Sequence, residues 1–469
     1  MKASGEPRTG SARNSCPDQI GSSGMRILLV VHQFFPEFAG GTEVLTRSVA
    51  HSLARRGHEI SILAASPTSE APSDESRHDT YNFEGLLVHR FRHAYTRAVG
   101  QSSMMEMEFD NHLAGTLFER ILREFKPNLV HFFHFQRHGA NLVDIAVDAR
   151  IPCFYTPTDY WAICATGQLV LAGGRPCDGP TSRAGNCAKH LAQLRRRPMA
   201  GIISRVLPDQ MADLLVRAST RWPVHPIAQD LAAVGRRARE NVARLNRLTT
   251  IFSPSSEMTR TLCLYGVNPD LIRQSPYGID PIVPSARGTA ATQRVPGRLS
   301  VAFIGTLAPH KGCHVLVGAF NGIAEWQADL KIFGDPNRFP DYFASLKRLA
   351  DGATNIEFCD TFPNSRIGQV LANFDALVVP SIWRENTPLV VIAALAAHCP
   401  VIASDTPGLT ELVKDRVNGL LFQAGNPPAL RRKLTLLWEN KDLLSSLRSG
   451  CDTPRSTEDY VDELLDAYP

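Results

Sequence analysis

Short apolar runs alternate along the chain with longer segments in which apolar residues recur every three or four positions. A short run of Leu, Ile and Val is typical of a strand buried on both faces, and the periodic segments are typical of helices that cover a sheet. The first pair is a strand at 26–32 and a helix at about 42–56. Further strands are predicted at 59–64, 87–92, 129–133, 152–156, 249–253, 299–304, 330–334, 356–360, 376–379 and 401–404. Strands that alternate with helices predict an α/β protein with doubly wound parallel sheets.

The length of the chain predicts two domains. Its 469 residues, with 43% hydrophobic and 20% charged content, are enough for two globular units, each with its own core. We expect the first domain at residues 25–285 and the second at 296–455, joined by a flexible linker at 284–296. Residues 1–24 are polar and hold no apolar core, so we expect a disordered extension and no signal peptide.

Charge and cysteine content narrow the possible partners and location. A net charge of +4 is small for this length, which argues against nucleic acid as a partner. The ten Cys are scattered, several of them in apolar runs, and this fits buried thiols in a reducing cytosol. The longest apolar runs, such as 390–397, are far shorter than the roughly 20 residues that span a bilayer. We therefore expect a cytoplasmic protein.

The most informative stretch runs from Phe374 to Glu411. A polar loop, Arg384-Glu385-Asn386-Thr387, joins the strand at 376–379 to an apolar helix, with Thr387 as the expected N-cap. At this edge of a parallel sheet, the free N–H groups of Leu389 and Val390 would face outward with the positive end of the helix dipole. A diphosphate is a natural ligand for such a site. The alternative is an ordinary βαβ unit with a charged loop.

The same stretch resembles a known enzyme family. PSIWRENTPLV, then PVIASDTPGLTE and NGLLF, resemble the donor-binding half of the family 4 glycosyltransferases, which are retaining enzymes of the GT-B fold. The resemblance covers nearly the whole chain from Met25. It implies two Rossmann-like domains facing a central cleft, with the last helix, 456–469, crossing back to the first domain. Two Glu separated by seven residues mark the family's donor site; Glu385 matches the first, whereas Ala393 stands where the second usually holds the ribose.

Two glycine loops add to the resemblance. Gly40 and Gly41 follow the first strand, where absent side chains let backbone approach a phosphate, although a simple tight turn is the default for such a pair. In the family, the corresponding loop closes over the donor. The second loop contains Gly305, Thr306, His310 and Lys311.

Lys311 is the expected diphosphate clamp of that second loop. A Lys beside glycine backbone at a helix N-terminus can stabilise a diphosphate leaving group as its charge grows, although an ordinary surface Lys has the same spacing. Relatives usually carry Arg at the position of Thr306, and His310 could partly replace it. In relatives, the backbone near Phe358 holds the nucleotide base, and Glu411 would lie near the phosphates or ribose.

The first domain offers fewer candidates for the acceptor side. His131 and His134 end a predicted strand and are candidates for the edge of the cleft, or structural histidines. Thr158 stands where many relatives have His, which leaves Asp159 as the carboxylate that would orient the acceptor.

The resemblance implies transfer of a sugar from a nucleotide-diphosphate sugar to a hydroxyl of a glycan or lipid-linked acceptor. Lys311, Glu385 and Asp159 would be the catalytic residues. No DxD pair occupies a metal-binding loop position, so we expect no divalent metal and no cofactor. The alternatives are a GT-B scaffold that binds nucleotide without turnover, and a nucleotide-sugar hydrolase or epimerase.

Two further features remain open. Cys164, Cys177, Cys187 and His190 have the composition of a zinc site but no CxxC pair, so free thiols are the alternative. Residues 195–247 contain eleven Arg, no Lys and four acids. Such helices can contact the inner face of a membrane, or they can be ordinary solvated helices.

Overall fold

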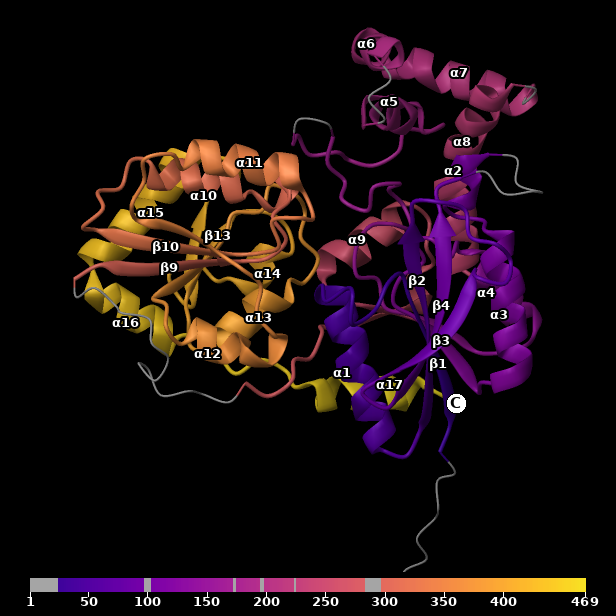
Figure 1. Cartoon of the computed structure of the whole chain (residues 1–469), viewed down its shortest axis with the longest axis horizontal. Coiled ribbons are helices and arrows are strands. Elements are labelled where there is room, and N and C mark those ends of the chain that lie inside the picture. Colours follow the sequence, from indigo (N-terminus) through magenta and orange to yellow (C-terminus); the bar gives the residue numbers. More distant parts are fainter. Residues whose placement is uncertain (1–23, 97–102, 172–173, 195–197, 223–224, 283–296) are drawn as a thin grey trace, which may run out of the picture.

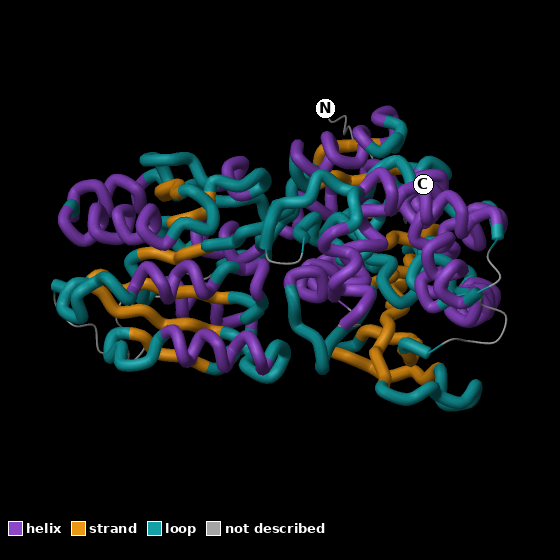
Figure 2. The backbone as a smooth tube through the Cα atoms, turned by 90° about the horizontal axis from the view of Figure 1, so that it is seen from above, coloured by secondary structure: helices purple, strands orange, loops and turns teal. Residues whose placement is uncertain are grey.

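The computed structural model describes residues 24–96, 103–171, 174–194, 198–222, 225–282 and 297–469, which form two α/β domains (Figure 1). The first 23 residues of the predicted extension and the whole of the predicted linker, 284–296, lie outside these residues. Figure 2 shows the strands in two separate groups, each accompanied by helices.

The first sheet has eight strands in the order β3-β4-β2-β1-β5-β6-β7-β8. All neighbours are parallel except β3 and β4, which pair antiparallel. The strands are β1 (Arg26–Val31), β2 (Glu59–Thr68), β3 (His78–Phe83), β4 (Leu86–Ala94), β5 (Leu129–Phe132), β6 (Cys153–Tyr155), β7 (Thr250–Ser253) and β8 (Ile272–Gln274). The sequence pattern did not predict β3, because its residues HDTYNF are only partly buried and contain no apolar run.

Helices connect these strands. They are α1 (Gly41–Arg55), α2 (Met104–Met107), α3 (His112–Phe125), α4 (Asn141–Asp148), α5 (Gly185–Leu194), α6 (Pro198–Val206), α7 (Asp209–Arg221), α8 (Pro226–Leu245), α9 (Ser256–Leu264) and the 3₁₀ turn η1 (Pro269–Leu271). Most of the β6–β7 connection is the long insertion that carries α5 to α8, whereas each of the other described connections of this sheet carries at most two helices.

The second sheet has six strands, all parallel, in the order β11-β10-β9-β12-β13-β14. They are β9 (Leu299–Ile304), β10 (Ala328–Phe333), β11 (Ile356–Cys359), β12 (Ala376–Val379), β13 (Val401–Ser404) and β14 (Gly419–Phe422). The helices are η2 (Pro309–Lys311), α10 (Cys313–Phe320), α11 (Pro340–Leu349), η3 (Asn364–Arg366), α12 (Ile367–Leu371), α13 (Leu389–Ala396), α14 (Leu409–Leu412), α15 (Pro427–Glu439) and α16 (Lys441–Ser449). The two sheets are the doubly wound α/β architecture that the sequence predicts.

The last helix, α17 (Thr457–Ala467), packs against α1 of the first domain. Glu458 accepts hydrogen bonds from Ser52, Arg55 and Arg56, all on α1 or at its end. Beyond the helix, Tyr468 hydrogen-bonds His131 in the centre of the first sheet. The end of the chain is therefore part of the first domain's core.

His131 gives the fold a pH dependence. Its ring is fully buried, and burial lowers its pKa from the usual 6.5 to about 3. The unfolded chain gains a proton on this ring below about pH 6.5 and the folded chain does not, so stability falls on acidification through that range. We expect His131→Gln to reduce the slope of the unfolding free energy against pH in this range by about 1.4 kcal/mol per pH unit. Urea unfolding of both proteins at several pH values tests this, and equal slopes would contradict it.

Candidate functional site

The centre of the candidate site is an ion pair between Lys311 and Glu385. The Lys311 ammonium lies 2.8 Å from Glu385 Oε1, and Ser381 Oγ donates to the same oxygen at 2.6 Å. The ammonium also lies 4.8 Å from the centre of the Trp383 ring. The side chain of Glu385 is buried and that of Lys311 is one quarter exposed, so only the cation is open to a ligand.

The two residues meet because they follow neighbouring strands. Lys311 ends η2, after β9, and Glu385 lies in the loop after β12. These strands are adjacent, and connections leave them in opposite directions along the sheet, which makes this the topological switch point. Open α/β sheets bind ligands at the carboxyl end of such a point. The pair therefore occupies the position where a ligand of the second sheet is expected.

Glu385 is ionised in this setting. Burial raises its pKa, but the charge and hydrogen bond of Lys311 and the hydrogen bond of Ser381 outweigh burial, and the pKa lies below its usual value. The carboxylate therefore neutralises Lys311 when no other anion is present.

The other residues of the second glycine loop contribute less charge than expected. His310 is largely buried, and burial followed by the charge of Lys311 lowers its pKa to about 4. The ring is neutral at pH 7, so it can offer a hydrogen bond but not the positive charge of the Arg that Thr306 replaces. Gly305 and Thr306 directly follow β9, and Thr306 is partly exposed.

The N-terminus of α13 differs in detail from the prediction. The N-cap is Pro388, and Thr387 Oγ1 donates to Pro254 O of the first domain, so the expectation that Thr387 caps the helix is wrong. Within the described residues, no hydrogen bond engages the N–H groups of Leu389 and Val390. These two N–H groups therefore have no partner within the helix, and their binding of an anion stays a prediction.

Three residues predicted to bind donor instead join the two domains in this structure. Asn386 Nδ2 donates to Pro157 O at 2.9 Å, and Glu411 accepts from the N–H groups of Ser256 and Glu257 at 2.9 and 3.1 Å. The Asn386 and Thr387 bonds fix the loop after β12 against the first domain, and the Glu411 bonds do the same for α14. Any role of the three residues toward a donor stays a prediction.

Phe358 lies on the edge strand β11, separated from β9 by β10. Its ring packs edge-on against Phe343, at 5.5 Å between centroids, and below the ammonium of Lys347. The structure does not bring this ring to Lys311; the sequence-based expectation concerns its backbone and stays a prediction.

The first sheet has its own cluster at the β1–β5 switch point. His32 follows β1 and His134 follows β5; their ring centroids are 4.2 Å apart. His134 Nε2 lies 3.1 Å from Asp159 Oδ2, in the loop after β6. Sequence reasoning proposed His134 and Asp159 but missed His32. His131, the other candidate, lies inside the core.

Glu43 completes this cluster, and its only sign in the sequence is an acid in the first turn of α1. Its side chain is almost fully buried, and burial raises its pKa. Oε1 has no hydrogen-bond partner and lies 3.5 Å from His32 Nε2. Glycine at position 40 leaves room for it, because a Cβ there would lie 2.6 Å from Glu43 Oε2. Nothing lies within 4 Å of the corresponding point at Gly41, so the N-terminus of α1 is open on that side.

The proposed zinc ligands give no metal site. Cys164, Cys177, Cys187 and His190 line one small cavity, yet within the described ranges no group of three or more His, Cys, Asp or Glu is placed to hold a metal ion. Burial raises the pKa of the Cys187 thiol to about 12, so it is protonated. The alternative of free thiols is the one that the structure favours.

Family models match both halves of the chain. A model described as a glycosyl transferase 4-like domain matches residues 40–278, and one for glycosyl transferases group 1 matches residues 298–440. The chain belongs to the family 4 glycosyltransferases. The resemblance seen in the sequence is thereby confirmed.

Curated relatives of this family 4 member share part of its length. D-inositol 3-phosphate glycosyltransferases of Actinosynnema mirum and Corynebacterium glutamicum are 31% and 30% identical over 38% and 42% of the chain. These matches cover 46% and 50% of the two relatives, about half of their length. An uncharacterized glycosyltransferase of Methanocaldococcus jannaschii is 21% identical over 87% of both chains.

Solved structures share the GT-B fold. Anabaena HepE, in complex with UDP and glucose, gives a TM-score of 0.59 at 14% identity over 94% of this chain and 98% of its own. Sucrose-phosphate synthase of Thermosynechococcus elongatus gives 0.65 at 16% identity over 95% and 98%. At such identities the likeness establishes the fold alone.

Proposed function

We propose that this chain is a retaining glycosyltransferase that moves a sugar from a nucleotide-diphosphate sugar to a hydroxyl acceptor. The observation that carries the proposal is the Lys311–Glu385 pair at the switch point of the second sheet, linked to the first-domain cluster by a hydrogen bond from Asn386 to Pro157. Pro157 is two residues from Asp159, so the loops that carry Glu385 and Asp159 meet.

The second domain would hold the donor. The diphosphate would take the exposed side of Lys311 and the free N–H groups that begin α13, where the helix dipole favours an anion. As the bond between the sugar and the diphosphate breaks, negative charge grows on the leaving group, and Lys311 would stabilise it. Glu385 would bind donor hydroxyls or the positive charge that develops on the sugar.

The first domain would hold the acceptor. Asp159, oriented by His134, would hydrogen-bond the attacking hydroxyl, and the open N-terminus of α1 at Gly41 would cover the donor when the domains close. Closure would exclude the water that otherwise hydrolyses the donor. The reaction needs no cofactor in this scheme.

The relatives suggest candidates for the substrates. HepE was solved with UDP-glucose, another neighbour, WaaG, is involved in lipopolysaccharide biosynthesis, and the relatives from Actinosynnema mirum and Corynebacterium glutamicum are named D-inositol 3-phosphate glycosyltransferases. We propose a UDP-sugar as the first donor to test and a role in surface polysaccharide or lipid-linked glycan assembly.

Calorimetric titration of UDP, GDP and ADP tests the donor site. We expect one nucleotide to bind, and Lys311→Ala to weaken its binding about 10- to 100-fold, because a charge-assisted contact to phosphate is lost. Lys433→Ala is the matched control, since the Lys433 side chain is 27% exposed against 25% for Lys311 and also lies near a carboxylate. Absence of binding by all three nucleotides would refute the proposal.

A nucleotide-binding scaffold is the second candidate. Ala393 is buried and offers no carboxylate for ribose, and the neutral His310 does not restore the charge missing at Thr306. Binding of a nucleotide without release of that nucleotide from any nucleotide sugar, with and without acceptors, would favour the scaffold.

A further inference from the structure

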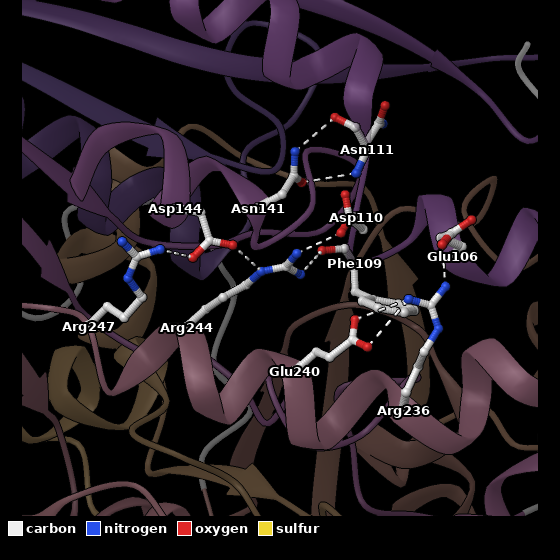
Figure 3. A network of polar contacts seen from close by, with 10 residues as sticks. All are labelled: Glu106, Phe109, Asp110, Asn111, Asn141, Asp144, Arg236, Glu240, Arg244 and Arg247. Carbon is white, nitrogen blue, oxygen red and sulfur yellow. Dashed lines mark hydrogen bonds and ion pairs between the residues drawn. The ribbon is translucent and has the colours of Figure 1, made fainter. Parts of the chain in front are cut away.

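The basic segment at 195–247 divides into two parts, and the part on α8 is an anchor within the first domain. Arg244 binds Asp110 and Asp144, and Arg247 binds Asp144 (Figure 3). Arg236 pairs with acids in the same network. Arg237 is buried; it donates to Trp161 O and lies over that ring. These arginines hold the insertion to the fold and are not available to a membrane.

The other part, α6 and α7, exposes apolar side chains. Sixteen large hydrophobic residues are exposed in the described chain, and nine of them lie between positions 194 and 227, which is far from a random scatter. Ile202, Ile203 and Val206 are on α6, Met211, Leu214 and Leu215 are on α7, and Trp222 directly follows α7; the other two, Leu194 and Ile227, are on α5 and α8.

Helix α7 has two apolar faces. Ala212, Val216 and Ser219 are buried, and Val216 packs close to Gly235 of α8. A second stripe faces solvent at helical spacing: Met211, Leu214, Leu215, Ala218 and Trp222. The large side chains of this stripe are 53 to 69% exposed. A helix needs only one apolar face to pack on its own domain, so the second face fits an external partner.

The charged side chains of α6 and α7 that have neither an ion pair nor a side-chain hydrogen bond among the described residues are all positive. Arg205, Arg217 and Arg221 are exposed, and no carboxylate of the described residues pairs with them. The acids of α7 are engaged elsewhere: Asp209 binds Lys189, and Asp213 accepts from the first turn of α5 and the residues before it. We name the surface of α6 and α7 formed by the exposed apolar residues and these three arginines the outer face.

We propose that the outer face docks on an anionic lipid bilayer. At the headgroup boundary of such a bilayer, the apolar side chains would contact the acyl chains and the arginines would contact the anionic headgroups. The Trp at the end of the stripe also suits this boundary. If the outer faces of two copies packed together, arginines would face arginines, which is unfavourable. A bilayer with anionic headgroups places negative charge against these arginines instead.

The position of the outer face fits this partner. The insertion leaves the first sheet at the carboxyl end of β6, the loop that carries Asp159, and returns through α8 to β7. Figure 1 shows α6 and α7 at one edge of the molecule, above the first sheet and apart from the second domain. Within the described ranges, no helix is both long and apolar enough to cross a bilayer.

Vesicle sedimentation of the full chain tests the proposal. We expect binding to phosphatidylcholine vesicles that contain phosphatidylglycerol and little binding to phosphatidylcholine alone. The double variants Leu214→Ser with Leu215→Ser, and Arg217→Gln with Arg221→Gln, should each lower the partition coefficient about tenfold or more. All four side chains are exposed, so the fold should not be affected.

The controls are exposed residues of the same types elsewhere. Leu264→Ser, on α9, and Arg123→Gln, on α3, should leave vesicle binding unchanged. Equal binding to both vesicle types, or equal binding by the double variants, overturns the proposal. So does a dimer in solution that the same variants dissociate, because the occupant would then be a second copy. The nucleotide titration on each double variant should match the unmodified chain, so that this result is independent of the proposed donor site.

Discussion

Replacing Glu385 with glutamine should lower kcat about 100-fold while nucleotide binding stays the same or tightens. The substitution keeps the shape of the side chain and removes its charge. Without the carboxylate, Lys311 loses its neutralising partner and presents a full positive charge to the diphosphate. The developing positive charge on the sugar loses its stabilising anion, so the rate falls although the donor binds.

A lower kcat together with unchanged or tighter nucleotide binding would distinguish a catalytic Glu385 from a structural counterion. Once titration has identified the nucleotide, release of that nucleotide from its sugar donor measures kcat. Glu357→Gln is the control, because Glu357 pairs with Lys331 at 2.8 Å in the same sheet but is 61% exposed. A variant of Glu385 that loses stability and nucleotide affinity together, with kcat unchanged, would show that the carboxylate only holds Lys311 in place.

The sequence predicts the central strands of both sheets well because they are buried on both faces. The ranges 299–304, 376–379 and 401–404 coincide with β9, β12 and β13. Elements that rely on tertiary contacts were missed. The three-residue strand β8 has no apolar pattern of its own, and only pairing with β7 makes it a strand.

The sequence predicts several residues of the site but not the contacts between them. Lys311 and Glu385 were each identified by resemblance, but their 2.8 Å contact joins residues 74 positions apart, which no local pattern encodes. The same limit explains Glu411, whose carboxylate engages the N-terminus of α9 at positions 256 and 257. Glu43 was missed because an acid in the first turn of a helix is usually an ordinary surface residue.

At Gly312, which directly follows Lys311, an alanine should be costly for both stability and the site. The φ of Gly312 is +71°, a conformation that costs an alanine about 1 to 2 kcal/mol. A Cβ there would lie 1.9 Å from Pro380 O, so the turn after Lys311 or the loop before Ser381 must move. With overpacking of about 1 to 3 kcal/mol added, we expect Gly312→Ala to lower Tm by about 6 to 15 °C.

The variant Gly425→Ala separates the two causes of the lower Tm, which are the positive φ and the overpacking by the added Cβ. The φ of Gly425 is +70° and nothing lies within 4 Å of the point that an added Cβ would occupy, so Gly425→Ala meets only the backbone cost, about 3 to 6 °C in Tm. Nucleotide affinity should fall in Gly312→Ala alone, because the displaced turn and loop carry Lys311 and Ser381, which both hydrogen-bond Glu385. Equal Tm losses in the two variants would show that the close approach of Gly312 to Pro380 is not needed, and that Lys311 and Glu385 meet without this contact between their loops.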